Sequence, residues 1–135
     1  TILERKIIYG INSSFSHVIY SQFKLPHIRH IEYEIMIITA GEGRQFVGEG
    51  VSPYKAGDLT LIGSNVPHLH LCNSILNGTG DSKSSESVTV TPCIFPEHMK
   101  TLPDYKVVYE LLQRSQSGIR FSDFSLSARI YDMMQ

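Results

Sequence analysis

The sequence lacks three features that would each indicate a particular class of protein. It has no cluster of lysine and arginine residues, and its formal net charge is −1, so we expect these residues to bind no nucleic acid. It has no apolar run near the ~20 residues that a membrane-spanning helix needs, and no basic and then apolar leader opens it. We therefore expect a cytoplasmic protein that makes no contact with a membrane.

The sequence is also poor in cysteine. Its two cysteines, Cys72 and Cys93, fit no CxxC or zinc-binding spacing, so we interpret them as free, mostly buried thiols. The rest of the composition is ordinary for a globular protein, with 41% hydrophobic and 19% charged residues. A chain of 135 residues is long enough for one domain with a single core.

Short segments rich in β-branched and aromatic residues make up most of the chain, and glycine, proline and asparagine separate them. We expect strands over residues 5–9, 15–20, 34–40, 45–47, 51–54, 59–62, 68–72 and 88–95. Residues 73–87 contain few apolar groups and many turn formers, and therefore predict a loop. The pattern indicates a mainly-β fold, either a small antiparallel barrel or a sandwich.

Helical spacing of apolar residues replaces the strand pattern towards the C-terminus. We expect Asp104 to cap a first helix and Ser122 or Asp123 to begin a second. The apolar residues that we assign to helix packing and a dimer surface are Leu111, Leu112, Leu126, Ile130 and Met133. The alternative is that they only cover the open side of the barrel. We divide the chain into a barrel, residues 1–100, and a helical appendage, residues 101–135.

A group of polar residues predicts a binding site. Residues of equal parity share a face of a strand, so we expect His30 and Glu34 to point the same way, as should His68 and His70. If the two strands face one another across a barrel, His30, Glu34 and His68 converge. Two imidazoles and a carboxylate can bind zinc, iron, manganese or nickel. The alternative is a polar pocket that hydrogen-bonds an organic ligand and holds no metal.

Several motifs follow one another along the chain in a characteristic order. They are Pro26, His30-Ile31-Glu32-Tyr33-Glu34, Gly41-Glu42-Gly43, Phe46-Val47-Gly48, Gly57-Asp58-Leu59, Leu61-Ile62-Gly63, Asn65 and Pro67-His68, with Leu111-Leu112-Gln113-Arg114-Ser115 and Gly118-Ile119-Arg120-Phe121-Ser122 in the tail. In this order and spacing they resemble the N-terminal, cupin-like sensor domain of AraC-type transcription regulators. The resemblance extends from about residue 24 to residue 135.

This resemblance implies a cupin-like double-stranded β-helix barrel, or jelly-roll, followed by two C-terminal α-helices. It implies that the barrel binds a small effector, for example a sugar, and that the chain forms a homodimer. It also implies a DNA-binding helix-turn-helix domain beyond Gln135, so that DNA is bound only through that further part. Effector binding would shift the arrangement of the barrel and the helices and so regulate transcription.

The sequence departs from metal-binding cupins at one position. Such sites usually have a histidine two residues before His30, where this chain has Ile28. We therefore expect no cofactor and no catalytic residue, and we consider a metal at His30, Glu34 and His68 only as a remnant of the cupin site. The residues that we expect to line the ligand pocket are Arg29, His30, Glu32, Glu34, Met36, His68 and His70.

Two other functions are compatible with the sequence. The first is a stand-alone, metal-dependent cupin enzyme, such as a dioxygenase, isomerase or decarboxylase, with His30, Glu34 and His68 as metal ligands. The second is a structural oligomerisation domain with an empty barrel. The motifs favour the sensor domain, which is not an enzyme.

Overall fold

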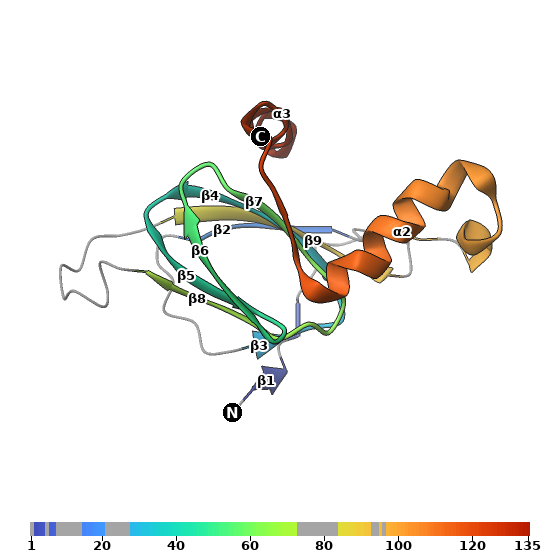
Figure 1. Cartoon of the computed structure of the whole chain (residues 1–135), viewed down its shortest axis with the longest axis horizontal. Coiled ribbons are helices and arrows are strands. Elements are labelled where there is room, and N and C mark those ends of the chain that lie inside the picture. The colour runs from blue at the N-terminus through green and yellow to red at the C-terminus, as the bar shows by residue number, and fades with distance from the viewer. Residues whose placement is uncertain are drawn as a thin grey trace.

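A computed structural model describes residues 2–4, 6–7, 15–20, 28–72, 84–92, 95 and 97–135 of the chain. Its strands form two five-stranded sheets that face one another and enclose a barrel (Figure 1). The first sheet contains, in spatial order, β1 (Leu3–Glu4), β3 (Ile28–Arg29), β8 (His68–Cys72), β5 (Glu42–Val47) and β6 (Gly50–Lys55). The second contains β10 (Ile119–Phe121), β7 (Leu59–Ile62), β4 (Tyr33–Ala40), β9 (Ser84–Val90) and β2 (Phe15–Tyr20).

The pairing of these strands confirms the predicted fold class, a mainly-β barrel of the cupin, or jelly-roll, type with helices after it. Apart from the parallel pair β1 and β3, the described pairings are antiparallel. β4 pairs with β7 and β9, whereas β5, the next strand in sequence, pairs with β6 and β8 in the facing sheet. Successive segments therefore alternate between the sheets, as in double-sheet jelly-rolls.

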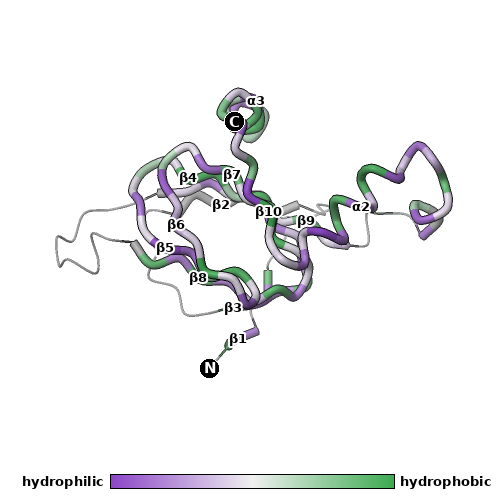
Figure 2. The backbone as a smooth tube through the Cα atoms, in the orientation of Figure 1, coloured by the Kyte–Doolittle hydropathy of each residue, from purple (hydrophilic) through white to green (hydrophobic). Residues whose placement is uncertain are grey.

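Strand alternation places polar side chains inside the barrel. On β4, Glu34 and Met36 are buried on the face that looks towards the other sheet, and the register pairs them with Thr89 and Ser87 of β9, which are buried as well. Figure 2 shows hydrophilic and hydrophobic positions interleaved along both sheets. Because buried polar groups are normally retained only where they find partners, this interior is suited to contact polar groups.

Apolar contacts hold the two sheets together at two places among the described residues. Val47 of β5 packs against Ile62 of β7 and against Val66. Tyr54 of β6 packs against Met36 of β4. Complete burial of one such side chain stabilises the fold by roughly 1.5–3 kcal/mol, so each cluster ties the sheets together while polar groups occupy other parts of the interior.

Two α-helices follow the barrel, α2 (Lys106–Arg114) and α3 (Phe124–Met134). The short 3-10 turns around them are η2 (Glu97–Lys100), η3 (Pro103–Tyr105) and η4 (Ser115–Ser117). In Figure 1 α2 projects sideways from the barrel, and α3 lies above β4 and β7 at the top of the view. In the part of the chain that the structure describes, no helix combines the length and the apolar character that crossing a bilayer requires.

One of the two predicted helix caps is confirmed. Asp123 caps α3, since its Oδ1 accepts hydrogen bonds from the backbone N–H groups of Ser125 at 2.9 Å and Leu126 at 3.3 Å. The prediction for Asp104 is wrong, because this residue lies inside η3, and the residue that precedes α2, Tyr105, makes no side-chain cap. Proline at the start of η3 fixes the backbone for a tight turn one step before the helix.

Two strand predictions are also corrected. β9 begins at Ser84, so the predicted loop over residues 73–87 is wrong at its C-terminal end, where the polar residues form a strand that faces the barrel interior. The predicted strand over residues 5–9 is wrong at residues 6–7, which are not in a strand. Residues 73–83, Cys93 and the side chain of Cys72 lie outside the described residues, and so does the interpretation of the cysteines.

The segment after α2 lies closely against the barrel. The N–H of Gly63 donates to the carbonyl of Ser115 at 2.9 Å, and a Cβ at Gly63 would lie 2.8 Å from the same oxygen. Gly118 has a φ of 73°, and a Cβ there would lie 2.6 Å from Cγ1 of Val47. The chain then forms β10 along the edge of β7, so the C-terminal part contributes a strand to the barrel as well as two helices.

The apolar helix residues assigned to packing and dimerisation differ widely in exposure. Leu112 is buried, whereas Leu111, Leu126 and Ile130 are half-buried. Met133 is 80% exposed. Within this chain, therefore, Leu112 already serves packing, while Met133 stays available at the surface.

Candidate ligand-binding site in the barrel

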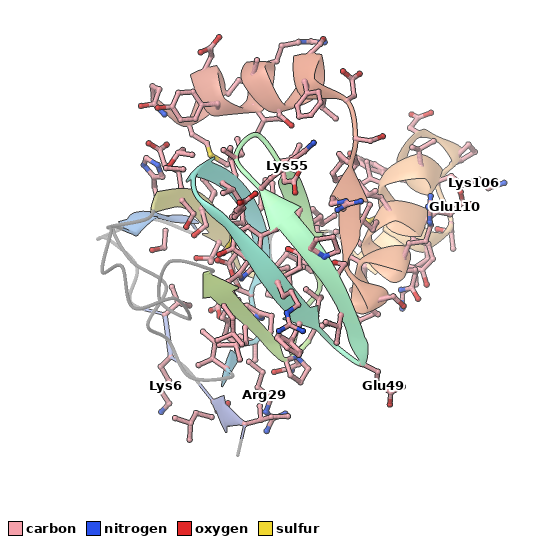
Figure 3. The ribbon with its side chains drawn as sticks, turned by 60° about the vertical axis from the view of Figure 1, so that its left-hand side comes forward. Lys6, Arg29, Glu49, Lys55, Lys106 and Glu110 are labelled. Carbon is pink, nitrogen blue, oxygen red and sulfur yellow. The ribbon has the colours of Figure 1, made fainter. Side chains whose placement is uncertain are left out.

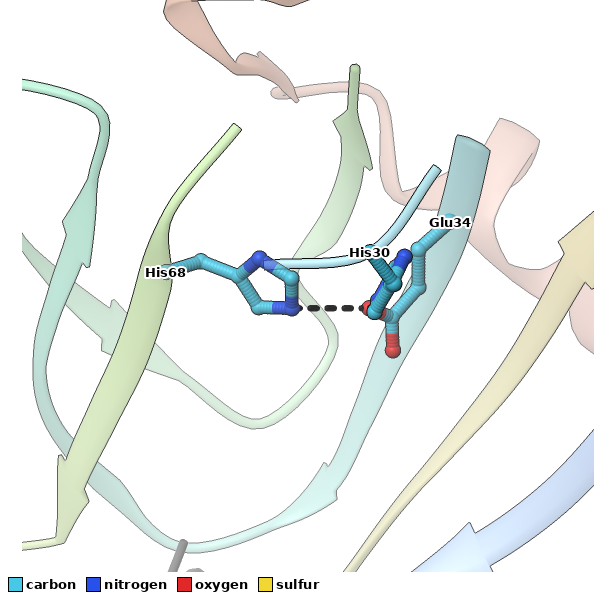
Figure 4. Close-up of side chains that lie close together, drawn as sticks. All are labelled: His30, Glu34 and His68. Atoms are coloured by element: carbon cyan, nitrogen blue, oxygen red, sulfur yellow. Dashed lines mark hydrogen bonds and ion pairs between the residues drawn. The ribbon is translucent and has the colours of Figure 1, made fainter. Parts of the chain in front are cut away.

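Three of the predicted site residues meet inside the barrel. Nε2 of His68, at the start of β8, lies 3.0 Å from Oε2 of Glu34 on β4, and Nε2 of His30 lies 3.2 Å from the same oxygen (Figure 4). The two imidazole rings meet edge to face with their centroids 5.0 Å apart. Strand parity predicted this convergence, although His30 lies between the ends of β3 and β4 rather than on a strand.

Backbone carbonyls fix the orientation of both imidazoles. Nδ1 of His30 lies 3.1 Å from the carbonyl of Glu32, and Nδ1 of His68 lies 2.9 Å from the carbonyl of Val66. Because a carbonyl only accepts, each Nδ1 must carry a hydrogen. Each Nε2 then meets the Glu34 carboxylate either as a second N–H group, in an imidazolium, or with a bare lone pair. The cluster is therefore built around a positive charge, supplied by protons or by a metal ion.

The carboxylate is ionised in this arrangement. Burial raises the pKa of Glu34, but the hydrogen bonds from His30 and His68 and the positive charge on both rings outweigh that effect and hold the pKa well below its usual value of 4.5. A buried carboxylate between two imidazoles gives the site a fixed acceptor at neutral pH.

The same three side chains fit a metal ion. One ligand atom from each of His30, Glu34 and His68 lies within 4.8 Å of the others. A histidine that donates Nδ1–H to a carbonyl presents Nε2 to a metal, which is the usual outer support of metal-bound histidine. These residues would hold a zinc-, iron- or manganese-type ion, which would act as a Lewis acid with coordination positions left for a ligand.

A second polar group lies further along β8. Nε2 of His70 lies 3.1 Å from Oε1 of Gln45 on β5, and Nε2 of Gln45 donates to Oγ of Ser52 at 3.2 Å. The ring of Tyr54 packs edge to face on His70 at 5.1 Å between centroids. Burial lowers the pKa of His70 to about 4, with the charge of Glu34 acting in the opposite direction, so this imidazole is neutral at pH 7 and can both donate and accept.

Sequence analysis missed several residues of the polar interior. Ser85, Ser87 and Thr89 line the inner face of β9, and all three are buried. Their alternation with Glu86, Val88 and Val90 has the period of two that marks a strand, but the many serines suggested a loop. Gln45 and Tyr54 were missed because polar and aromatic residues on strands do not reveal which face they occupy.

The remaining predicted residues lie in three different settings. Glu32 is 3% exposed, with Oε1 3.9 Å from Nδ1 of His30, so it belongs to the buried cluster. Met36 belongs to the apolar cluster with Tyr54. Arg29 points away from the barrel at the surface (Figure 3), with Nη2 4.0 Å from Oε2 of Glu4. The structure therefore brings the histidines and glutamates together and leaves Arg29 outside.

One loop connects this site to the segment after α2. The N–H of Asn65, a residue with a φ of 59°, donates to the carbonyl of His30 at 2.7 Å. The carbonyl of Val66 holds His68. Gly63 of the same loop donates to Ser115 at the C-terminal end of α2. A displacement of either imidazole therefore acts directly on the loop that holds the base of α2.

This geometry has counterparts among known proteins. The family model described as AraC-like ligand binding domain matches residues 11–70. ToxT from Vibrio cholerae is similar in structure at 12% identity and a TM-score of 0.60, over 91% of this chain and 48% of that chain. An apo variant of ToxT from Vibrio cholerae strain SCE256 is similar at 13% identity and a TM-score of 0.58, over 91% and 47%. No curated protein matches the sequence.

A cupin 2 conserved barrel domain protein from Salinispora arenicola CNS-205 is similar at 18% identity and a TM-score of 0.47, over 66% of this chain and 73% of that chain. The chain spans about half the length of the ToxT structures that it matches. At these identities the structural likeness concerns the fold, and the family match confirms the resemblance that the motifs indicated. Residues 11–70 therefore match the AraC-like ligand-binding domain family, and the described strands of the chain form a cupin-like barrel.

Proposed function

We propose that this chain is the effector-sensing domain of a transcription regulator and that its effector binds between the two sheets. The observation that carries the proposal is the convergence of buried polar side chains from both sheets, with Glu34 and His68 at 3.0 Å as its centre. Ligand sites combine a largely enclosed space with a few precisely placed polar groups. The family match to a ligand-binding domain supports the same conclusion.

A carbohydrate suits the chemistry of these groups. Glu34 accepts hydrogen bonds, the imidazole of His70 both donates and accepts, and the amide of Gln45 offers both functions as well. Sugar hydroxyls donate and accept in the same way, so they can exchange hydrogen bonds with such a mixed set of groups.

The effector would act through α2 and α3. Binding at His30 and His68 favours one position of the loop that contains Gly63, and that loop holds the base of α2 through Ser115. A ligand shifts a conformational equilibrium only through contacts that differ between the two states. The loop supplies such contacts, because it touches both the site and the helix.

The proposal also assigns a role to each part of the regulator. The barrel, residues 1–100, senses the effector in the cytoplasm, and the helical part, residues 101–135, mediates a homodimer and leads to a helix-turn-helix domain beyond Gln135. The half-buried Leu126 and the exposed Met133 of α3 support the dimer proposal. Sedimentation of the chain at tens of micromolar tests the dimer proposal, because a strict monomer would contradict it. This concentration follows the order of magnitude of weak-interface affinities.

The test of the effector site is a thermal-shift titration of the chain with neutral pentoses, hexoses and polyols. We expect at least one compound to raise Tm, since a ligand that binds only the folded state stabilises it. His68→Gln and Glu34→Gln should remove most of that shift, whereas the exposed change Arg29→Gln should leave it intact. A ligand whose shift survives both site variants, with their circular dichroism unchanged, would place the site elsewhere.

The geometry of the metal ligands favours a second candidate function, a metal-dependent cupin enzyme. Three potential ligand atoms lie within 4.8 Å of one another, with both Nδ1 atoms held by carbonyls. Elemental analysis of the purified chain distinguishes the two functions. One equivalent of iron, manganese or zinc that disappears in His68→Gln, together with turnover of an organic substrate, would replace the sensor proposal.

A further inference from the structure

We infer that Ser85 and Ser87 on β9 are ligand-contacting residues that hydrogen-bond a neutral, hydroxyl- or carbonyl-bearing effector from the wall opposite His70. The inference rests on the proposed function of the barrel and specifies both the residues and the chemical class of the ligand. Neither serine belongs to the cluster around Glu34.

The carrying observation is a pair of buried hydroxyls without partners. Ser85 is 0% exposed and Ser87 is 1% exposed, and neither Oγ has a hydrogen-bond partner. As alternate residues of one strand they present their side chains on the same face, about 6.6 Å apart along it. A buried hydroxyl that finds no partner destabilises the folded protein, and each such group in a native protein requires an explanation.

Three other buried hydroxyls of the described residues make hydrogen bonds. Oγ of Ser115, which is also 0% exposed, donates to the carbonyl of Leu112 at 2.6 Å. Oγ of Ser127 donates to the carbonyl of Asp123 at 3.4 Å. Thr89, on the same face of β9 as the serine pair, donates to the carbonyl of Ser16 at 3.5 Å. The lack of partners at Ser85 and Ser87 is therefore not a general property of buried serine and threonine hydroxyls in this fold.

The position of the pair points to a ligand between the sheets. The register places Ser87 beside Met36, and Met36 packs on Tyr54 of the facing sheet. The ring of Tyr54 in turn contacts His70, which is held by Gln45. The serine pair and the His70 group thus belong to facing sheets, with Met36 and Tyr54 packed between them. An effector that contacts both would take the place of these two side chains.

Charge selects the class of ligand. The buried side chains include Glu32 and Glu34, and no lysine or arginine is buried among the described residues. The two imidazoles that contact Glu34 are already engaged by that carboxylate. A carboxylate ligand would place another negative charge in this interior without a lysine or arginine to pair it, which is strongly unfavourable. Two serine hydroxyls instead match the hydroxyls of a neutral polyol.

A stability measurement on the ligand-free chain tests the inference independently of any ligand. Ser85→Ala and Ser87→Ala remove a hydroxyl that has no partner, so each should raise Tm by roughly 1–4 °C. Ser115→Ala is the matched control, because it removes a hydroxyl of equal burial that does make a hydrogen bond, and it should lower Tm. If the β9 variants lose as much Tm as the control, the hydroxyls are satisfied by water or protein and the inference is wrong.

A binding measurement tests the ligand class. We would titrate the full chain calorimetrically with D-galactose, D-xylose, myo-inositol and, as the anionic probe, oleate. The neutral compound that binds best should bind roughly 5- to 30-fold more weakly to Ser85→Ala and to Ser87→Ala, and with unchanged affinity to Ser115→Ala. Binding of oleate alone, or equal affinity in all variants, would overturn the inference. If no probe binds any variant, the sensor proposal fails, and the Tm comparison still decides the status of the two serines.

Discussion

Glu34 and His68 join the two sheets of the barrel, with 3.0 Å between Oε2 and Nε2. Glu34 lies on β4 of one sheet and His68 on β8 of the other, and both side chains are almost completely buried. Removing one partner of a buried ion pair leaves an uncompensated charge, which typically costs 3–5 kcal/mol. This contact is therefore a structural element of the barrel as well as the centre of its candidate site.

Glu34→Gln keeps the shape of the side chain and removes its charge. We expect the free energy of unfolding to fall by about 3 kcal/mol, measured by urea denaturation at pH 7. The control is Glu110→Gln, which breaks an exposed ion pair with Lys106 of 4.0 Å on α2 and should change stability by less than about 1 kcal/mol. If both variants change the free energy of unfolding by the same small amount, the charge of Glu34 does not stabilise the fold.

Stability should fall as the pH is lowered from neutral towards 4. Unfolded histidine binds its proton near pH 6.5, whereas burial lowers the pKa of His70 in the folded chain to about 4, so between these values the unfolded state binds more protons. The unfolding free energy should decrease by roughly 3 kcal/mol over this window. Below the ordinary value of 4.5, the lowered pKa of Glu34 adds a further loss in the same direction.

His70→Gln isolates the contribution of the histidine. Glutamine can still hydrogen-bond to Gln45 but does not titrate, so the decrease in unfolding free energy between pH 6.5 and pH 4 should be much smaller than in the wild type. Arg29→Gln, an exposed change outside the barrel, should retain the full slope. A wild-type slope in His70→Gln would mean that this imidazole is already protonated in the folded chain.

The helix caps offer a direct contrast between two aspartates. Asp123→Ala removes an oxygen that accepts from two backbone N–H groups at the start of α3 and should lower the unfolding free energy by about 1 kcal/mol. Asp104→Ala should change it by less than about 0.5 kcal/mol, because Asp104 caps no helix and is exposed. The reverse order of the two effects, in urea denaturation, would contradict the cap assignment.

Gly63 controls the contact between the site loop and the base of α2. Gly63→Ala would place a Cβ 2.8 Å from the carbonyl oxygen of Ser115, so the segment after α2 must move. We expect a loss of roughly 1–3 kcal/mol in stability and faster amide exchange over residues 112–118 by hydrogen–deuterium exchange. Gly50→Ala is the control, because the nearest atom to its Cβ, the carbonyl oxygen of Val47, lies 3.4 Å away. Unchanged exchange in Gly63→Ala would show that the loop does not hold the helix.

The barrel and the convergence at its centre were predictable, because strand periodicity and turn residues are local properties of the sequence. His30 and Glu34 share a motif, and the order of the motifs placed His68 opposite them. The inner face of β9 was not predictable in the same way. Serine favours loops on average, and only the pairing of β9 with β2 and β4 on either side makes Ser85 and Ser87 strand residues.

Arg29 and Asp104 show two further limits of sequence reasoning. Arg29 is next to His30 in sequence, but β3 turns its side chain outwards, because it faces the opposite way to the buried Ile28 on the same strand. Asp104 has the chemistry of a cap, but the proline before it begins a 3-10 turn. In both cases the residue type indicated a possible role. Whether the side chain could take that role depended on the local backbone, a strand in the first case and a 3-10 turn in the second.

A crystal structure of the chain with a bound neutral polyol tests the central claim most directly. We predict ligand density enclosed between the two sheets, within hydrogen-bonding distance of His70 and of Ser85 or Ser87. Outside the barrel, a groove of about 340 Å³ between α3 and β4, lined among others by Ile37, Phe124 and Tyr131, offers a competing place. Density confined to that groove, with the barrel interior unchanged, would contradict the account.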